Sequence, residues 1–280
     1  MDTSSNWYDL SSVEIQQQIG DYTSKKQEGP GNKELLKNIF SCLDLTTLEG
    51  SDNDERIAQL CQKALSFAEK GLPFPAAVCV YPPFVRAAKK YLTGSGVRVA
   101  AVTGYFPSGQ APLFLKMEEM RYALGEGTEE IDFVISRGRF LEGDINYTYD
   151  EIASARELCN DLPMKVILET GELKTLDNIR KASEIAIAAG ADFIKTSTGK
   201  SSPAATEEAA FIMIHVIQDH YLRTGRKIGF KPSGGIVESS QAMGYFLLVR
   251  EILGHEWLSS DYFRIGASRL ADNLAREISG

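Results

Sequence analysis

The sequence from Gly190 to Lys200, GADFIKTSTGK, contains one lysine inside a short apolar run and a second in the polar turn that follows. If the run is a β-strand, Lys195 shares one face with Phe193, because side chains alternate along a strand. An ammonium group is seldom buried without a partner or a task, and desolvation would free its amine to attack carbonyls. A lysine that snorkels to solvent is the alternative, and this stretch alone fits both.

Similar apolar runs recur along the chain, each followed by a polar turn, a helical pattern and a glycine. We predict strands at 39–45, 76–80, 97–103, 131–135, 165–169, 191–197, 227–231 and 263–266. Strands that alternate with helices pair in parallel through crossover connections. Eight such units in 280 residues predict an α/β fold, a closed (β/α)8 TIM barrel. An open doubly wound sheet is the alternative if the strand count is wrong by one or two.

Helical patterns fill the intervals between these runs. Apolar residues from Ile57 to Ala68 keep helical spacing, and those from Leu176 to Ala189 do the same. We predict that Ser202-Pro203 opens the next helix as N-cap and first helical residue, and that Ser239 or Ser240 starts the one after. Residues 1–32 are polar and are predicted to form a short helix and a linker before a single barrel domain at 33–280.

Composition limits the classes of partner. The net charge of −8 argues against nucleic acid or an anionic membrane as the main partner. No apolar run approaches the roughly 18 residues of a membrane span, and the first residues lack the pattern of a signal peptide. The four cysteines are far apart without a CxxC pair, so they indicate neither a zinc site nor a disulfide framework. Reduced thiols fit the cytoplasm, which is the predicted location.

Polar residues stand at the ends of the predicted strands, where barrel enzymes carry their active-site groups. They are Asp44, Thr46, Cys79, Asp132, Lys165, Glu169, Lys195 and Lys231. So many ionisable groups on strands are a poor choice for stability alone, so the pattern favours a function. Lys165 and Glu169 share a face by the period-two rule and fit a plain ion pair at the barrel mouth equally well.

Lys195 is the candidate amine nucleophile, forming a Schiff base with an aldehyde or ketone. Lys231, one strand over, would supply a cation that lowers the pKa of Lys195. Asp132 would then be a counter-charge and a proton relay, through water or Lys231. The alternative for Asp132 is an ion pair with Arg137 or Arg139, which follow its strand.

Glycines after the last strands indicate a phosphate site. Gly234-Gly235 and the segment Gly266-Ala267-Ser268 follow the seventh and eighth predicted strands, where barrel enzymes often bind phosphate with backbone N–H groups. The turn Thr198-Gly199-Lys200 would add further donors. Gly-Gly pairs are also common in ordinary turns.

Other motifs have plainer interpretations. The GKS at 199–201 is not a nucleotide-binding P-loop, because Ile194 occupies the position of its required glycine. His215, His220 and His255 fit no metal or triad spacing and are predicted to be helix-surface or capping groups. Cys79, between valines, is most simply a small core residue.

Taken in order along the chain, several motifs resemble those of the deoxyribose-phosphate aldolase family, class I aldolases on a (β/α)8 barrel. The matching stretches are LDLT at 43–46, VCV at 78–80, EID at 130–132, KVILETGEL at 165–173, FIKTSTGK at 193–200, GFKPSGG at 229–235 and FRIGAS at 263–268. The KTSTGK and GFKPxGG pair is the most specific part of the resemblance.

The resemblance implies reversible cleavage of 2-deoxy-D-ribose 5-phosphate to D-glyceraldehyde 3-phosphate and acetaldehyde. It implies Lys195 as the Schiff-base lysine, Lys231 as the group that perturbs its pKa, and Asp132 in the proton relay. The residues expected to bind substrate are Asp44, Thr46, Cys79, Lys165, Thr196, Thr198, Gly199, Lys200, Gly234, Gly235, Gly266, Ser268 and Arg269. No metal or other cofactor is expected, because the iminium is the electron sink. A homodimer is expected.

Two positions depart from the family pattern. Val237 stands where an arginine is usual, and Arg269 stands where serine or threonine is usual. We hypothesise that Arg269 takes over part of the phosphate binding. The rival functions are another Schiff-base aldolase, of the transaldolase or sugar-bisphosphate type, and a catalytically silent barrel that binds a phosphorylated metabolite.

Overall fold

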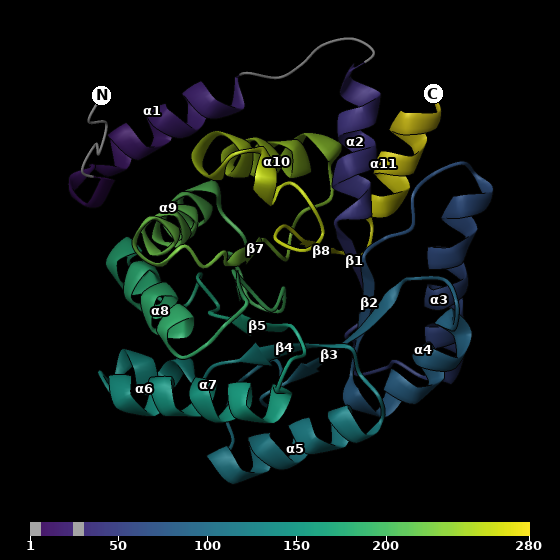
Figure 1. Cartoon of the computed structure of the whole chain (residues 1–280), viewed down its shortest axis with the longest axis horizontal. Coiled ribbons are helices and arrows are strands. Elements are labelled where there is room, and N and C mark those ends of the chain that lie inside the picture. Colours follow the sequence, from purple (N-terminus) through teal and green to yellow (C-terminus); the bar gives the residue numbers. More distant parts are fainter. Residues whose placement is uncertain (1–6, 25–30) are drawn as a thin grey trace.

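A parallel eight-stranded barrel forms the centre of the protein, whose computed structural model describes residues 7–24 and 31–280 (Figure 1). The strands are β1 (Leu43–Thr46), β2 (Ala77–Val80), β3 (Arg98–Thr103), β4 (Glu130–Val134), β5 (Met164–Ile167), β6 (Phe193–Lys195), β7 (Gly229–Lys231) and β8 (Ile265–Ala267). Each predicted strand is therefore present. Their order in the sheet is β7-β6-β5-β4-β3-β2-β1-β8.

The barrel closes between β7 and β8 through isolated bridges rather than a continuous ladder. Phe230 pairs with Phe263 and Ser233 pairs with Gly266, both in parallel. The N–H of Gly266 donates to the carbonyl of Pro232 at 3.0 Å. These contacts join the two ends of the sheet, so the open-sheet alternative is wrong and the TIM barrel is confirmed.

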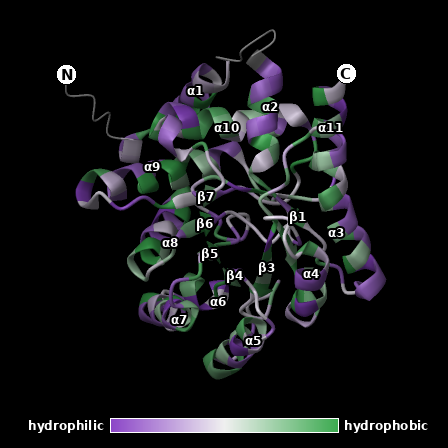
Figure 2. Ribbon diagram, turned by 45° about the vertical axis from the view of Figure 1, so that its right-hand side comes forward, coloured by the Kyte–Doolittle hydropathy of each residue, from purple (hydrophilic) through white to green (hydrophobic). Residues whose placement is uncertain are grey.

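Helices surround the barrel (Figure 1). They are α1 (Ser12–Thr23), α2 (Gly31–Ser41), α3 (Asp54–Glu69), α4 (Val85–Leu92), α5 (Leu113–Gly125), α6 (Arg137–Leu141), α7 (Ile145–Cys159), α8 (Leu176–Ala188), α9 (Glu207–Thr224), α10 (Ser239–Leu253) and α11 (Leu270–Ser279). Hydrophilic and hydrophobic residues alternate along them (Figure 2). In α3, for example, Ile57, Cys61, Ala64 and Phe67 are buried at helical spacing, and Asn53 caps the first turn.

Most predicted strand boundaries are off by one or two residues, and two predictions about helix starts and ends are wrong. Residues 39–41 belong to α2 rather than to the first strand, because Ile39 and Phe40 are buried on the inner face of that helix. Ser202-Pro203 does not open a helix: its peptide bond is cis, and α9 begins later, at Glu207, where the side chain of Thr206 caps the first turn. The start predicted at Ser239 is confirmed, since α10 begins there.

The chain before the barrel packs on its outside. Helix α1, the helix predicted within residues 1–32, contacts α9 and α10, and Trp7 Nε1 donates to Asp219 on α9 at 3.0 Å. His215 of α9 lies against the Trp7 ring and is buried, so its predicted surface position is wrong. Residues 1–6 and 25–30 of the predicted extension lie outside the described residues, and the division at residue 32 stays a prediction. No helix in the described ranges has the length and hydropathy of a membrane span.

Candidate active site

Lys195 lies inside the barrel, not at its surface. It ends β6, between β5 and β7, and only 1% of the residue is exposed. Its Nζ donates to Asp132 Oδ2 at 2.7 Å. Phe193, two residues earlier, is also buried, as the shared face of the strand predicted. The snorkelling alternative for Lys195 is therefore wrong.

Asp132 of β4 is surrounded by lysines from three neighbouring strands. Its Oδ2 accepts from Lys195 and from Lys231 of β7, each at 2.7 Å, and its Oδ1 accepts from Lys165 of β5 at 2.9 Å. All four side chains are almost fully buried. The alternative ion pair of Asp132 with an arginine after its strand is wrong, since Arg137 instead binds Glu172.

A second set of charges lies beside the lysines. Asp44 of β1 accepts from Lys231 and also from Arg264, with Arg264 Nη1 2.6 Å from Oδ1. Lys165 donates to Glu130 Oε2 at 2.6 Å, and Arg264 Nη2 donates to Glu130 Oε1 at 2.7 Å. These contacts hold the long lysine side chains in fixed positions across the barrel.

The ion pair between Lys165 and Glu169, which was one of the two interpretations of these residues, does not form. β5 ends at Ile167, and Glu169 adopts a left-handed backbone conformation with φ of 57°, so the alternation of side chains does not extend to it. Its buried carboxylate instead accepts hydrogen bonds from the backbone N–H and the hydroxyl of Thr198. Glu169 therefore supports the turn after β6.

The lysines differ in how their surroundings affect protonation. Burial lowers the pKa of Lys195 below its ordinary value; Asp132 opposes this effect, and the nearby ammonium of Lys231 reinforces it. Burial also disfavours the charged form of Lys231, but the carboxylates of Asp132 and Asp44 outweigh it and raise the pKa of Lys231. Lys195 is thus the amine that is most readily neutral, as a nucleophile must be.

The carboxylate and thiol near Lys195 also have fixed states. Burial would raise the pKa of Asp132, but the surrounding lysines outweigh it and hold that pKa well below its usual value, so Asp132 is an anion. Burial raises the pKa of Cys79 to about 12, so its thiol stays protonated. Cys79 packs in an apolar cluster inside the barrel with Val102 and Ile167, consistent with a small core residue.

A cavity of about 320 Å³ opens where β1, β6, β7 and β8 end. Of the residues predicted to bind substrate, those that line it are Thr46, Thr198, Gly199, Lys200, Gly234, Gly235, Gly266, Ser268 and Arg269. Arg269 is exposed and immediately precedes the first turn of α11. Helix N–H groups and a guanidinium therefore lie at one opening, which suits an anion.

Close backbone contact fixes the shape of this cavity. Gly234 has φ of 87°, and a Cβ added to it would lie 2.7 Å from Gly199 Cα. Only glycine allows the turns after β6 and β7 to touch in this way. Thr196 ties the same elements together, because its hydroxyl accepts from the N–H of Ser233 at 3.0 Å.

Comparison with known proteins identifies the family. A family model described as DeoC/LacD family aldolase matches residues 39–245. The chain belongs to the DeoC/LacD aldolase family. It is 46% identical over 257 residues to the deoxyribose-phosphate aldolase of Homo sapiens, covering 87% of this chain and 80% of that protein. A putative deoxyribose-phosphate aldolase of Caenorhabditis elegans is 40% identical over 277 residues, or 96% of this chain and 89% of that protein.

A solved structure supports the same assignment. The crystal structure of a putative deoxyribose-phosphate aldolase from Coccidioides immitis superimposes with a TM-score of 0.74 at 27% identity. The match covers 96% of this chain and 98% of that one. The family resemblance noted in the sequence is therefore confirmed, and it extends over nearly the whole chain.

Three charged residues near the site of this DeoC/LacD aldolase were not among those predicted from its sequence. Arg264 and Glu130 bind the buried cluster, and Arg56 of α3 lines the cavity. A signal existed for Arg264, which alternates with Phe263 and Ile265 and therefore faces away from them into the barrel. Glu130 carries the same signal, two residues before Asp132. Arg56 lies on a helix whose distance from the cavity the sequence does not give.

Proposed function

We propose that this aldolase reversibly cleaves 2-deoxy-D-ribose 5-phosphate to D-glyceraldehyde 3-phosphate and acetaldehyde, with Lys195 as the Schiff-base lysine. The observation that carries the proposal is the buried Lys195 amine, 2.7 Å from Asp132, whose carboxylate is shared with Lys231. The substrate is supported by the relatives named deoxyribose-phosphate aldolase and by the cavity lined by the turns after β6, β7 and β8, whose lining suits an anion.

The proposed chemistry begins with the neutral amine of Lys195. It attacks the C1 aldehyde of the open-chain sugar, and loss of water gives a protonated iminium. A base removes the proton of the C3 hydroxyl while the C2–C3 bond breaks, and the electron pair of that bond moves into the iminium to give an enamine. Glyceraldehyde 3-phosphate leaves. Protonation of the enamine at C2 and addition of water then release acetaldehyde and restore the amine.

Asp132 and Lys231 have distinct proposed roles in this sequence. Asp132 is an anion before the bond breaks, so it stabilises the cationic iminium; it takes up the proton of the C3 hydroxyl through water and then returns it to C2 of the enamine. Lys231 remains a cation, so it keeps the Lys195 amine neutral between turnovers. Lys165 and Asp44 hold these groups in place, and Cys79 contributes a wall of the site.

The phosphate of the substrate is proposed to lie in the 320 Å³ cavity against Gly234, Gly235 and the start of α11. Arg269 would add a charge-assisted contact there. Lys200 also lines this cavity, where its ammonium group pairs with Glu49 at 2.7 Å. We expect Lys200 to leave Glu49 and bind the phosphate when substrate enters.

Replacing Arg269 with serine, the residue type usual in the family, is expected to raise KM for the phosphorylated sugar about 10-fold with little change in kcat, since one guanidinium contact to phosphate is lost. Steady-state kinetics with 2-deoxyribose 5-phosphate and with unphosphorylated 2-deoxyribose would measure this. The unphosphorylated sugar is the control, because its KM should not change. An unchanged KM for the phosphorylated substrate would refute the role of Arg269.

The function is tested by incubating the protein with acetaldehyde, reducing with borohydride and locating the adduct by peptide mass. A mass gain of one reduced ethyl group on Lys195, together with release of glyceraldehyde 3-phosphate from the phosphorylated sugar, is the expected result. Lack of any adduct on the folded protein would overturn the proposal. Activity with a longer ketose donor and none with acetaldehyde would instead indicate a transaldolase-type enzyme.

We further propose a cytoplasmic homodimer. The four free, buried cysteines support the cytoplasm, and the homodimer rests on the family resemblance alone; a tetramer, as named for the deoxyribose phosphate aldolase of Aeropyrum pernix, is the alternative. Sedimentation equilibrium of the full chain would measure the oligomeric state.

A further inference from the structure

Glu130 and Arg264 form a layer of buried charge next to the proposed catalytic lysines, on the side of the N-terminal ends of the strands. Glu130 is the first residue of β4, and Arg264 immediately precedes β8. Neither touches the cavity where substrate is proposed to bind. Both are buried, and each joins groups that the reaction uses: Glu130 binds Lys165, and Arg264 binds Asp44.

The charges of this cluster balance only when one basic group is neutral. Its buried acidic members are Asp44, Glu130 and Asp132, and its buried basic members are Lys165, Lys195, Lys231 and Arg264; Arg98, which also contacts Glu130, is partly exposed to solvent and is not counted. Three acids against four bases leave one excess positive charge if every base is protonated. A buried net charge is costly, so the cluster favours the loss of one proton.

Lys195 is the member that best accommodates that loss. Its ammonium has one carboxylate partner, Asp132, which it shares with Lys231. Lys165 has two close carboxylate partners, Asp132 and Glu130, and Lys231 has two, Asp132 and Asp44. The pKa values follow the same order, since burial lowers that of Lys195 whereas the carboxylates raise that of Lys165 against the effect of burial.

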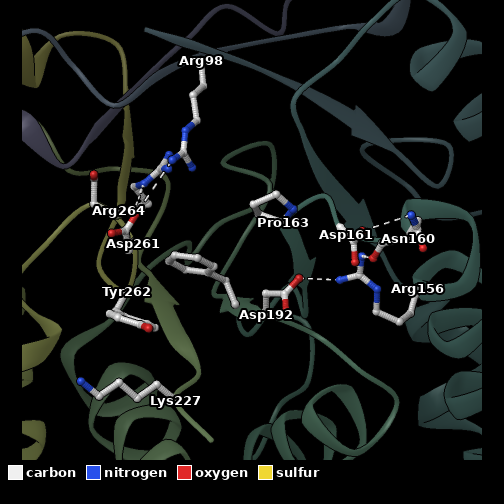
Figure 3. A pocket seen from close by; sticks show the side chains of 12 residues that line it. Arg98, Arg156, Asn160, Asp161, Pro163, Asp192, Lys227, Asp261, Tyr262 and Arg264 are labelled. Atoms are coloured by element: carbon white, nitrogen blue, oxygen red, sulfur yellow. Dashed lines mark hydrogen bonds and ion pairs between the residues drawn. The ribbon is translucent and has the colours of Figure 1, made fainter. Parts of the chain in front are cut away.

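The layer formed by Glu130 and Arg264 reaches solvent at the N-terminal ends of the strands, opposite to the end where substrate is proposed to bind. A cavity of about 510 Å³ lies there, where Arg98 and Arg264 stand together at one side (Figure 3). Arg98 Nη1 donates to Glu130 Oε1 at 3.0 Å, and its side chain is 44% exposed. Lys227 lines another part of the same cavity, next to Tyr262, and pairs with Glu256 instead (Figure 3).

We propose that Glu130 and Arg264 are positioning residues: through the charges of their neighbours they control whether Lys195 is protonated, without contacting substrate. The proposal rests on the proposed role of Lys195 as the Schiff-base amine. Glu130 acts through Lys165 and Asp132, and Arg264 acts through Asp44 and Lys231. The groups that face Lys195 itself are Asp132, Lys231 and the protonated thiol of Cys79.

The two residues should therefore have opposite effects on the pH dependence of adduct formation. The measured quantity is the rate of formation of the borohydride-trapped adduct as a function of pH, and its acid limb is the pH range in which that rate falls on acidification. In Glu130→Gln one negative charge is removed, so neutral Lys195 is favoured and the acid limb should move down by about one pH unit. In Arg264→Gln one positive charge is removed, so Lys195 is held protonated and the limb should move up by about one pH unit. At pH values on the acidic side of the limb the rate then falls about 10-fold in Arg264→Gln, and it recovers at alkaline pH.

Conservative and matched variants distinguish this role from a structural one. Arg264→Lys keeps the charge and should restore the wild-type limb. Arg98→Gln, at the exposed end of the same chain of contacts, should move the limb in the direction of Arg264→Gln by a smaller amount. Lys227→Gln removes a cation from the same cavity that does not bind Glu130, so its limb should stay at the wild-type pH.

The possible results distinguish a failure of this inference from a failure of the proposed function on which it rests. If wild type forms no adduct on Lys195, the proposed function fails. If wild type forms the adduct but Glu130→Gln and Arg264→Gln lose rate with an unmoved limb, or move it in the same direction, the positioning role is overturned. Thermal unfolding and circular dichroism check each variant, and the partly exposed Arg98→Gln supplies the test if Arg264→Gln does not fold.

Discussion

Lys195→Ala is expected to lose the borohydride-trapped adduct completely and to lower kcat by at least about 10⁴-fold, because no other group can form the covalent intermediate. Lys165 and Lys231 are too strongly paired with carboxylates to replace it as neutral amines. The measurement is peptide mass after reduction, together with the rate of glyceraldehyde 3-phosphate release. Both readouts should fall together.

Lys195→Arg is the matched control for charge. It keeps a cation next to Asp132 but has no amine that forms a Schiff base, so it should be as inactive as Lys195→Ala. An adduct that persisted in either variant would assign the nucleophile to another lysine. A mass shift on Lys165 or Lys231 would identify which one.

Asp132→Asn is expected to lower turnover by about 10²–10⁴-fold through loss of the proton relay, and to destabilise the fold by about 3–5 kcal/mol through loss of a buried ion-pair partner. The amide cannot balance the three ammonium groups that Asp132 accepts from. Lys195 should then be neutral at lower pH than in wild type, so the acetaldehyde adduct still forms. Retained trapping with lost turnover is the signature of a relay, measured by comparing adduct yield with kcat.

Glu151→Gln provides the control for stability alone. Glu151 is equally buried and accepts from Lys116 at 2.9 Å and from the hydroxyl of Ser136 at 2.8 Å, outside the proposed site. Its loss should lower the free energy of unfolding by a similar amount and leave kcat within about twofold. If Asp132→Asn lowered kcat no more than Glu151→Gln, the relay assigned to Asp132 would be wrong.

Sequence patterns predicted the barrel because its strands are buried on both faces and read as short apolar runs between helical patterns. The same reasoning misplaced Ile39 and Phe40, since an apolar run that continues from a buried helix into a strand carries no mark at the junction. Period two correctly placed Lys195 and Asp132 in one interior. It failed for Glu169, where the chain has already left the strand.

The contacts among charged side chains were harder to predict than their positions. Arg137 and Glu169 were near their expected partners in sequence, yet they bind Glu172 and Thr198 in the fold. Partner choice depends on which side chains reach across the barrel, and this follows from strand stagger rather than from local spacing. The family resemblance placed Lys231 and Asp44 in one site, although they lie 187 residues apart in the chain. Their ion pair was not predicted from the sequence.

The strands β7 and β8 are joined by isolated bridges, whereas every other neighbouring pair of strands in the barrel forms a ladder. The turns that follow these two strands are the ones proposed to hold the phosphate. A phosphate ester bound there as proposed would contact both turns and so link the two strands, which make few hydrogen bonds with each other. We therefore expect substrate to stabilise this junction, so that its backbone amides exchange with solvent more slowly when the phosphorylated sugar is bound.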